Sequence, residues 1–193
     1  DYVVTEAGFG SDMGAEKFMH IKAETSGKAP DCVVMNVTVR SMKLHGKAFG
    51  ERGGYRPSKD ELETENVTAV VAGARSNLDK HIKNMLRFGV PVVVSINRFT
   101  SDTDAELEAI EEAARASGAS SVCRTEVHSK GGEGGEALAN AVVDSIHDHV
   151  AAGRPFLPLV GPNDSIEKKV ESIATRMYGA SSVSIEAPAL RQL

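Results

Sequence analysis

Three short apolar segments constrain the fold of this chain most strongly. They read CVVMNVTVR (Cys32–Arg40), GVPVVVSINRF (89–99) and ASSVCRTEV (119–127). Valine and isoleucine fill them continuously instead of alternating with polar residues, which is typical of strands that are covered on both faces. Amphipathic helices are predicted between them. The sequence therefore predicts an α/β protein with a mostly parallel sheet, flanked by helices and connected by right-handed crossovers.

The helices are predicted from hydrophobic positions three and four residues apart. In the longest one, Leu78, Ile82, Met85 and Leu86 fall on one face. A further strand is predicted in DYVVTEA at the start of the chain. The predicted helices are Met13–Lys22, Glu61–Phe88, 101–118, Glu136–Val150 and Ser165–Tyr178.

Composition changes after residue 153. The stretch RPFLPLVGPNDS holds three of the seven prolines and reads as a linker. We therefore expect an α/β core over residues 1–153, and a linker plus the start of a second, smaller domain over residues 154–193. The chain opens with DYVVTE, inside a predicted strand and without a methionine, so we also expect a part of the protein upstream of Asp1.

Charge and apolar content argue against several classes of function. The net charge of −5 disfavours a general nucleic-acid binder, which would show a basic face. No apolar run approaches the roughly 20 residues that span a bilayer. Cys32 and Cys123 each lie in a predicted strand, so we expect buried, reduced thiols and no disulfide or metal framework.

The loops that follow the predicted strands are polar and contain glycine. In open α/β sheets, ligands bind beyond the carboxyl ends of the strands, so these loops are expected to share one ligand-binding edge. They read EAGFGSDMG, RSMKLHGKAFGERGG, NRFTSDTD and EVHSKGGEGG.

The first of these loops carries Gly8, Gly10 and Gly14, which invites a dinucleotide-binding hypothesis. The usual fingerprint adds an acidic residue after the second strand, where this chain has Arg40 and Lys43. Arg40 could accept a phosphorylated ribose, so an NADP-dependent oxidoreductase stays an alternative. The glycines could equally serve a tight turn and close packing.

Two other loops suggest a nucleotide without its usual phosphate grip. Asn97 and Arg98 end a strand in the manner of base-reading residues, although an exposed polar strand end would look the same. In KGGEGG (Lys130–Gly135), four glycines surround one glutamate before a helix, which suits an anion or a flat ring. A bare turn stays possible there. The sequence contains no Walker phosphate-binding motif.

The histidines give no metal site. His147 and His149 are two residues apart and do not share a helix face. His81 is expected on the surface of a long helix. His45 and His128 fall in predicted ligand-edge loops and are the two worth following. No arrangement with a recognisable nucleophile is found, so no catalytic residue is assigned.

Five blocks in fixed order connect these loops to a known family. They are DYVVTEAGFGSDMGAEKF (1–18), VTVRSMKLHG (37–46), GVPVVVSINRFTSDTDAE (89–106), EVHSKGGEGG (126–135) and IEKKVESIATRMYGA (166–180). Together they resemble formate–tetrahydrofolate ligase, also called 10-formyltetrahydrofolate synthetase, from Asp1 to about Ala180. The resemblance implies a P-loop NTPase-like fold whose phosphate-binding loop would lie upstream of this chain.

The resemblance also implies an activity. The family joins formate to tetrahydrofolate with ATP and Mg²⁺ through a formyl phosphate intermediate, and monovalent cations stimulate it. The partners expected are these small molecules and further copies of the parent chain, with no nucleic acid and no membrane. A cytoplasmic location is expected, and a mitochondrial one stays open. Because the phosphate grip is missing, we expect this chain alone to be inactive.

Site residues follow from the resemblance position by position. Phe9 and Phe99 correspond to aromatic residues that pack on the folate, and Gly10, with Gly8, would let the ring approach. A ring held between aromatic faces is oriented for reaction. The implied folate residues are Phe9, Gly10, Phe99 and His128. The implied nucleotide residues are Asn97, Arg98, Lys130, Gly131, Gly132 and Glu133.

This chain departs from the family pattern at several positions. The family usually has tryptophan where His128 stands, which suggests a second alternative, a non-catalytic folate- or nucleotide-binding module. Ser41-Met42 replaces the usual Ala-Leu, and Gly46-Lys47 replaces two glycines after His45. The stretch 47–56 diverges, so no ligand role is assigned to it.

Overall fold

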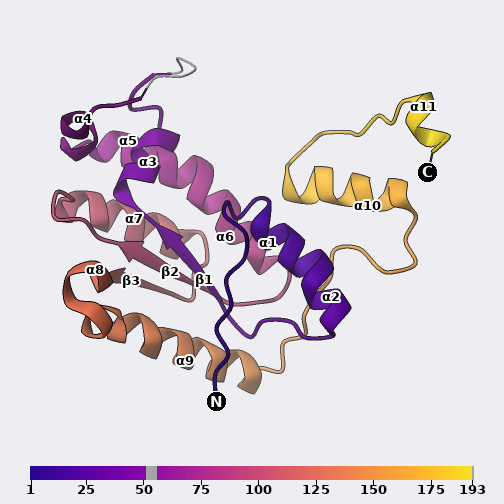
Figure 1. Cartoon of the computed structure of the whole chain (residues 1–193), viewed down its shortest axis with the longest axis horizontal. Coiled ribbons are helices and arrows are strands. Elements are labelled where there is room, and N and C mark those ends of the chain that lie inside the picture. Colours follow the sequence, from indigo (N-terminus) through magenta and orange to yellow (C-terminus); the bar gives the residue numbers. More distant parts are fainter. Residues whose placement is uncertain (51–55, 193) are drawn as a thin grey trace. The chain divides into compact units, whose positions relative to one another are not determined.

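The computed structural model describes residues 1–50 and 56–192 and divides the chain into two compact units (Figure 1). The sheet unit consists of residues 31–86 and 90–154. The terminal unit consists of residues 1–30, 87–89 and 155–193. Compactness within one chain does not define independently folding domains, so the domains 1–153 and 154–193 stay a prediction.

A three-stranded parallel sheet forms the centre of the sheet unit, which confirms the predicted α/β class. Its strands are β1 (Val33–Val37), β2 (Val92–Asn97) and β3 (Ser121–Thr125), in the order β1-β2-β3. The central strand is buried on both faces, as a continuous valine run predicts. The register pairs Val37 with Ile96 and Asn97 with Thr125, so the three strands end side by side.

Helices cover both faces of this sheet. Figure 1 shows α9 on one side of the strands and α5, α6 and α7 on the other, and α7 and α9 both contact β2 and β3. The predicted helix at 136–150 is confirmed, and Thr103 caps α7 as expected. The helices are α3 (Val39–His45), α4 (Lys59–Glu63), α5 (Val67–Gly73), the π-helix η2 (Ala74–Leu78), α6 (Asp79–Leu86), α7 (Asp104–Ala116) and α9 (Glu136–Ala151).

The single helix predicted over 61–88 is wrong at its start. Helix α4 ends at Glu63, and α5 begins at Val67 after an N-cap in which Asn66 accepts a hydrogen bond from the Ala69 amide at 3.0 Å. Between them, the Leu62 and Thr64 carbonyls accept hydrogen bonds from the buried Lys43 ammonium at 3.0 and 2.9 Å. The break thus serves a tertiary contact that helical periodicity does not reveal.

Two other predicted boundaries also change. The strand predicted to run to Arg40 ends at Val37, because Thr38 and Ser41 form a capping box that begins α3. The predicted loop after β3 is helical, with α8 (Val127–Lys130) followed by the 3₁₀-helix η3 (Gly131–Gly135).

The strand predicted in residues 1–7 is wrong, because these residues form no regular structure and Val3 and Val4 are exposed. The predicted helix at 13–22 is confirmed and extends further, as α1 (Gly14–Lys17), the π-helix η1 (Phe18–Lys22) and α2 (Ala23–Ser26). It ends at Gly27, which has a left-handed conformation.

The terminal unit packs around Phe88. The Phe88 ring stacks on Phe156 with centroids 5.9 Å apart and meets His20 edge-on at 5.1 Å. Met19 and Met177 are buried in the same unit. The predicted helix at 165–178 is confirmed as α10 (Ile166–Ser172) with the π-helix η4 (Ile173–Met177), and α11 (Ala187–Leu190) follows.

Both cysteines are free, and both are half-buried where full burial was predicted. Desolvation raises the pKa of Cys32 to about 11; the nearby Asp31 charge adds to this, and a hydrogen bond with the Val93 backbone opposes it. Within residues 1–50 and 56–192, no helix is both long and apolar enough to cross a membrane.

Candidate functional site

The carboxyl ends of the three strands bring polar and aromatic residues together in the sheet unit. Arg40 lies in the first turn of α3, just after β1. Asn97, Arg98 and Phe99 end and follow β2, and the Arg98 amide donates a hydrogen bond to the Thr125 carbonyl at 3.0 Å. Glu126 follows β3 directly. This edge is where ligands bind in open α/β sheets.

The Phe99 segment, residues 98–103, is fixed by side-chain hydrogen bonds. The buried Asp102 carboxylate accepts the Phe99 amide at 2.8 Å. Burial raises the pKa of Asp102, with the Glu106 charge as a further contribution, while the Phe99 amide, Lys43 and Arg40 act in the opposite direction. The Phe99 side chain itself is 37% exposed, and the Arg40 guanidinium lies 4.4 Å from its ring centroid.

A fully buried ion pair anchors this segment from below. Lys43 Nζ lies 2.7 Å from Glu106 Oε1, and the two side chains are 1% and 0% exposed. The Lys43 ammonium also donates to the Leu62 and Thr64 carbonyls, so each of its three protons has an acceptor. Glu106 in turn accepts the Asn66 amide at 2.7 Å and the Thr103 amide at 3.3 Å. Lys43 is therefore occupied and cannot serve a ribose phosphate.

The glycine segment, residues 126–135, is held mainly through its backbone. The Glu126 amide donates to the Gly134 carbonyl at 3.0 Å, and a Cβ on Gly134 would lie 2.6 Å from the Glu126 backbone. Gly131 has φ +60° and ψ −142°, which favours glycine. Gly132 has neither constraint, because a Cβ there would meet no atom within 4 Å and its φ is ordinary. Close packing therefore explains Gly134 but leaves Gly132 unexplained.

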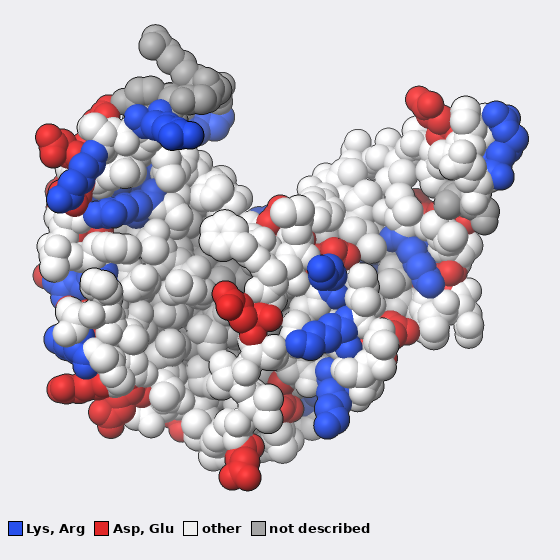
Figure 2. Space-filling view, viewed as in Figure 1, with Lys and Arg blue, Asp and Glu red and all other residues white. Residues whose placement is uncertain are grey.

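The Glu126 carboxylate forms ion pairs with two cationic side chains, Arg98 and Lys130. Glu126 lies 2.5 Å from Lys130 and 3.8 Å from Arg98. The hydrogen bond from Lys130 and the positive charge of Arg98 hold the pKa of Glu126 below its usual range. With the exposed Glu133 of the same segment, these side chains carry no net charge. On the face shown in Figure 2, described acidic and basic side chains are intermixed.

Sequence comparison with known proteins identifies the family of this chain. A sequence model described as formate–tetrahydrofolate ligase matches residues 1–193. The chain is 45% identical over all 193 residues to the formate–tetrahydrofolate ligase of Desulforamulus reducens, covering 33% of that protein. It is also 45% identical to the enzyme of that name from Staphylococcus aureus strain NCTC 8325, covering 32% of it. This chain belongs to the formate–tetrahydrofolate ligase family. It spans about a third of the length of the curated relatives that it matches.

Most of the site residues implied by the family lie at the sheet edge. Asn97 and Arg98 are half-buried, and the Asn97 side chain makes no hydrogen bond with the described residues. Phe99, His128, Lys130, Gly131, Gly132 and Glu133 are exposed. Phe9 and Gly10 belong to the terminal unit, where the Phe9 side chain is fully exposed. Phe9 and Gly10 were predicted to lie at this edge because a strand was expected before them. No strand precedes them in the structure. The roles of all these residues stay predictions.

The glycines of the first loop have structural explanations. Gly10 has φ +82°, and its carbonyl accepts the Gly14 amide at 2.7 Å. A Cβ on Gly14 would lie 1.6 Å from the Gly8 carbonyl oxygen. Because no strand precedes them, the strand–loop–helix context of a dinucleotide fingerprint is missing from residues 1–26. The oxidoreductase alternative therefore loses its only support.

His45 and the divergent stretch play no defined part at the edge. His45 is an exposed residue of the last turn of α3, not of a loop as predicted. The stretch 47–56 includes residues 51–55, which lie outside the described residues.

Sequence reasoning missed the residues that support Phe99. Lys43, Asp102 and Glu106 are buried. The sequence signal for Glu106 was the capping pattern that begins α7, but its pairing with Lys43 is 63 residues distant in sequence and had no local sign. Arg40 was considered only as a phosphate ligand.

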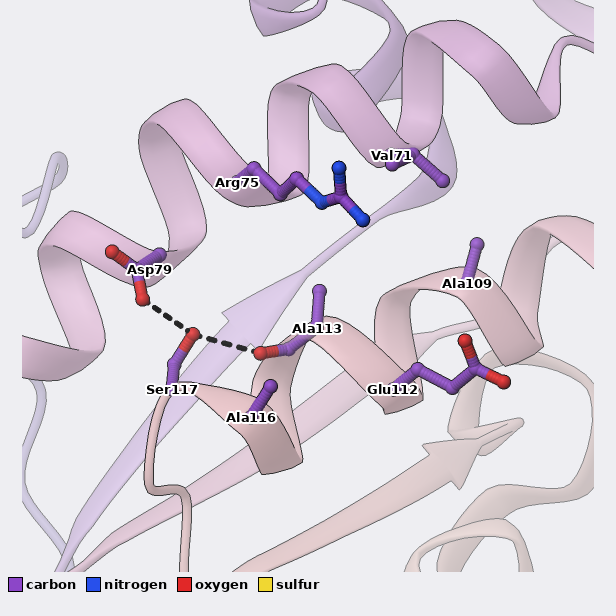
Figure 3. A pocket seen from close by; sticks show the side chains of 8 residues that line it. All are labelled: Val71, Arg75, Asp79, Ala109, Glu112, Ala113, Ala116 and Ser117. Carbon is purple, nitrogen blue, oxygen red and sulfur yellow. Dashed lines mark hydrogen bonds between the residues drawn. The ribbon is translucent and has the colours of Figure 1, made fainter.

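A groove elsewhere in the sheet unit does not belong to this edge. It has a volume of about 400 Å³ and is lined by residues of α5, η2 and α6 on one side and mainly of α7 on the other. Figure 3 shows Arg75 reaching into it from η2, and Ser117 Oγ lying 2.8 Å from Asp79 Oδ1. None of the predicted site residues lines it. Its lining residues are Val71, Arg75, Asp79, Ala109, Glu112, Ala113, Ala116 and Ser117.

Gly132 leaves its backbone uncovered, beside Arg98, Lys130 and Glu126. Uncovered backbone amides can face an anion or a flat ring. No group of three or more His, Cys, Asp or Glu side chains in residues 1–50 and 56–192 is placed to hold a metal. We therefore assign no described residue to magnesium.

Proposed function

We propose that this chain provides the folate- and nucleotide-facing sheet edge of an enzyme that ligates formate to tetrahydrofolate at the expense of ATP. One observation carries the proposal. The parallel register places an exposed aromatic ring, Phe99, at the end of the strand that neighbours the glycine segment, whose Gly132 backbone is uncovered. An aromatic face suits a pterin, and an open glycine backbone suits a nucleotide.

The chemistry has two steps. Formate attacks the γ-phosphorus of ATP, giving formyl phosphate and ADP. A nitrogen of tetrahydrofolate then attacks the formyl carbon, phosphate leaves, and 10-formyltetrahydrofolate forms. Magnesium bound with ATP supplies charge neutralisation for the first step. Phe9, Phe99 and His128 would orient the folate, while Asn97, Arg98 and residues 130–133 would hold the nucleotide.

The role of the described residues is positioning more than proton transfer. Stacking on Phe99 limits the orientations of the folate ring, which brings its nitrogen toward the formyl carbon. Arg98 and Lys130 share Glu126, so their cations are already held near one another before a phosphate arrives. The monovalent cation and the homo-oligomer that the family implies belong to the same proposal.

A turnover assay tests the proposal. The intact protein should form 10-formyltetrahydrofolate from formate, MgATP and tetrahydrofolate, and omission of ATP should abolish the product. The chain of 193 residues alone should form none, because it has no Walker motif to grip the triphosphate. Product from the isolated chain would overturn the second expectation, and absence of product from the intact protein would overturn the first.

His128 favours a second candidate, a folate- or nucleotide-binding module without ligase activity. Its ring is exposed and smaller than the tryptophan that the family usually has there. The change His128→Trp should lower the Kd for tetrahydrofolate about fivefold or more, which is about 1 kcal/mol of added contact. An unchanged Kd would count against folate binding at this position. Binding without turnover in the intact protein would favour the module.

A further inference from the structure

Arg40 lies against Phe99, an exposed aromatic ring at the sheet edge. Its guanidinium carbon is 4.4 Å from the Phe99 ring centroid, within the range of a cation–π contact. Arg40 Nη2 also donates a hydrogen bond to Glu63 Oε1 at 3.1 Å, which ties the guanidinium to α4. One face of Phe99 is therefore covered by a cation that is itself held, while the side chain stays 37% exposed.

Stability alone does not explain this arrangement. Arg40 Nε is buried and has no hydrogen-bond partner among residues 1–50 and 56–192. A buried donor without an acceptor is unfavourable, and such groups are rare in folded proteins. An apolar side chain of similar length would cover the ring without that cost. Each buried donor without an acceptor calls for an explanation, and a functional role is one such explanation.

We propose that Arg40 is a positioning residue for the folate, which it serves by fixing the Phe99 ring from behind, and that Glu63 holds Arg40 in place. The inference rests on the proposed function, because it takes Phe99 as a folate contact. Asp102 fixes the backbone of Phe99, and Arg40 covers one face of its ring. The other ring face is therefore held in one orientation, in which a heterocycle can stack on it.

The chain offers a matched control in Lys59. Lys59 Nζ lies 3.8 Å from the same Glu63 oxygen, but its side chain is 80% exposed, and the cation over the Phe99 ring is Arg40. Loss of Lys59 therefore removes a cation from Glu63 without changing the support of the ring. Arg40→Met and Lys59→Met thus remove the same charge, and only the first touches Phe99.

The test measures equilibrium binding of tetrahydrofolate and of ATP to the intact protein. Arg40→Met should raise the Kd for tetrahydrofolate about three- to tenfold, the size expected for losing one cation–π contact. The Kd for ATP and the melting temperature should stay near their wild-type values. Arg40→Lys should recover part of the affinity, and Lys59→Met should change nothing. A lower melting temperature with unchanged folate binding would mean a purely structural role and would overturn the inference.

A double-mutant cycle with Phe99→Leu decides whether Arg40 acts through the ring. Phe99→Leu should raise the Kd for tetrahydrofolate, and adding Arg40→Met should then have no further effect. Multiplicative effects would overturn the inference. So would a Phe99→Leu effect without any Arg40→Met effect, and the proposed function would survive in that case. If Phe99→Leu itself leaves the folate Kd unchanged, both the inference and the folate contact at Phe99 are wrong.

Discussion

The segments that follow β2 and β3 lie at the same edge of the sheet but are held by different means. The Phe99 segment depends on buried side-chain charges, above all the Lys43–Glu106 pair and Asp102. The glycine segment has exposed ion pairs and depends on close backbone packing between Glu126 and Gly134. The first can present a side chain in a fixed orientation, whereas the second presents its backbone.

This difference teaches which substitutions each segment should tolerate. A segment fixed by buried charges is sensitive to loss of a charge, since the partner is then left unpaired in a poorly solvated place. A segment fixed by backbone proximity is sensitive to an added Cβ, but its exposed ion pairs contribute little. The predictions below test this contrast.

The largest effect is expected from Lys43→Met. This change leaves the Glu106 carboxylate buried without its cation and the Leu62 and Thr64 carbonyls without a donor. We expect a loss of about 3–5 kcal/mol in the free energy of unfolding. Urea denaturation of the intact protein, followed by circular dichroism, measures it.

Lys130→Met is the matched control for that change, because Lys130 is paired with Glu126 at the surface. Its effect on the free energy of unfolding should be much smaller, because exposed ion pairs contribute little. Similar losses for the two variants would show that burial does not distinguish the two ion pairs.

A smaller loss of stability is expected from Gly134→Ala. The added Cβ would lie 2.6 Å from the Glu126 backbone, which must then move. We expect a cost of about 1–3 kcal/mol, as for other overpacked sites. Gly132→Ala, with open space around the new Cβ, should change stability by less than about 0.5 kcal/mol. Thermal unfolding of the two variants compares them, and equal melting temperatures would contradict the packing argument.

Gly132→Ala should instead weaken nucleotide binding, if the open glycine face receives the nucleotide as proposed. A Cβ there would occupy the space into which the ligand must fit, and we expect the Kd for ATP to rise about fivefold, or about 1 kcal/mol. Gly161→Ala in the terminal unit is the control, because its Cβ would make only ordinary contacts at 3.6 Å. Calorimetric titration with ATP compares the Kd values of the two variants. An unchanged Kd for Gly132→Ala would contradict nucleotide binding at this face.

The parallel sheet could be predicted because its signal is local. The continuous valine run 92–94 is buried on both faces, as is typical of a parallel sheet, and glycine stops and polar caps mark the helices between the strands. The helix predicted over 101–118 corresponds to α7, which begins at Asp104 after the Thr103 cap. The strand predicted in the initial DYVV run is wrong, because an apolar composition does not guarantee a neighbouring strand to pair with.

The supports of the site could not be predicted in the same way. Lys43 and Glu106 look like surface residues in the sequence, and only the approach of α3 to α7 buries them together. The break between α4 and α5 follows from the same contact. Phe99 was found through family resemblance, but Arg40 behind it depends on a capping box at Thr38 that ends β1 early. Such residues are positioned by tertiary contacts that no local pattern encodes.

The smallest effects should appear in the pH dependence of stability, and they should have opposite signs in the two segments. Burial raises the pKa of Asp102, so its ionisation opposes folding. Relative to the wild type, the stability of Asp102→Asn should be lowest near pH 3 and should increase as pH rises through and above 3.8, the ordinary value. The Lys130 hydrogen bond lowers the pKa of Glu126, so its ionisation favours folding.

Glu126→Gln should therefore behave in the opposite way. It should match the wild type at low pH and become the less stable protein as pH rises toward 4.5, the ordinary value for glutamate. The difference should be fully present above that pH, because only the wild type gains from the ionised carboxylate. Melting temperatures of the two variants and the wild type at pH 3, 5 and 7 test both signs together. A parallel pH dependence in the two variants would mean that Asp102 and Glu126 have the same kind of environment. That result would contradict the distinction between a segment held by buried charges and a segment held by its backbone.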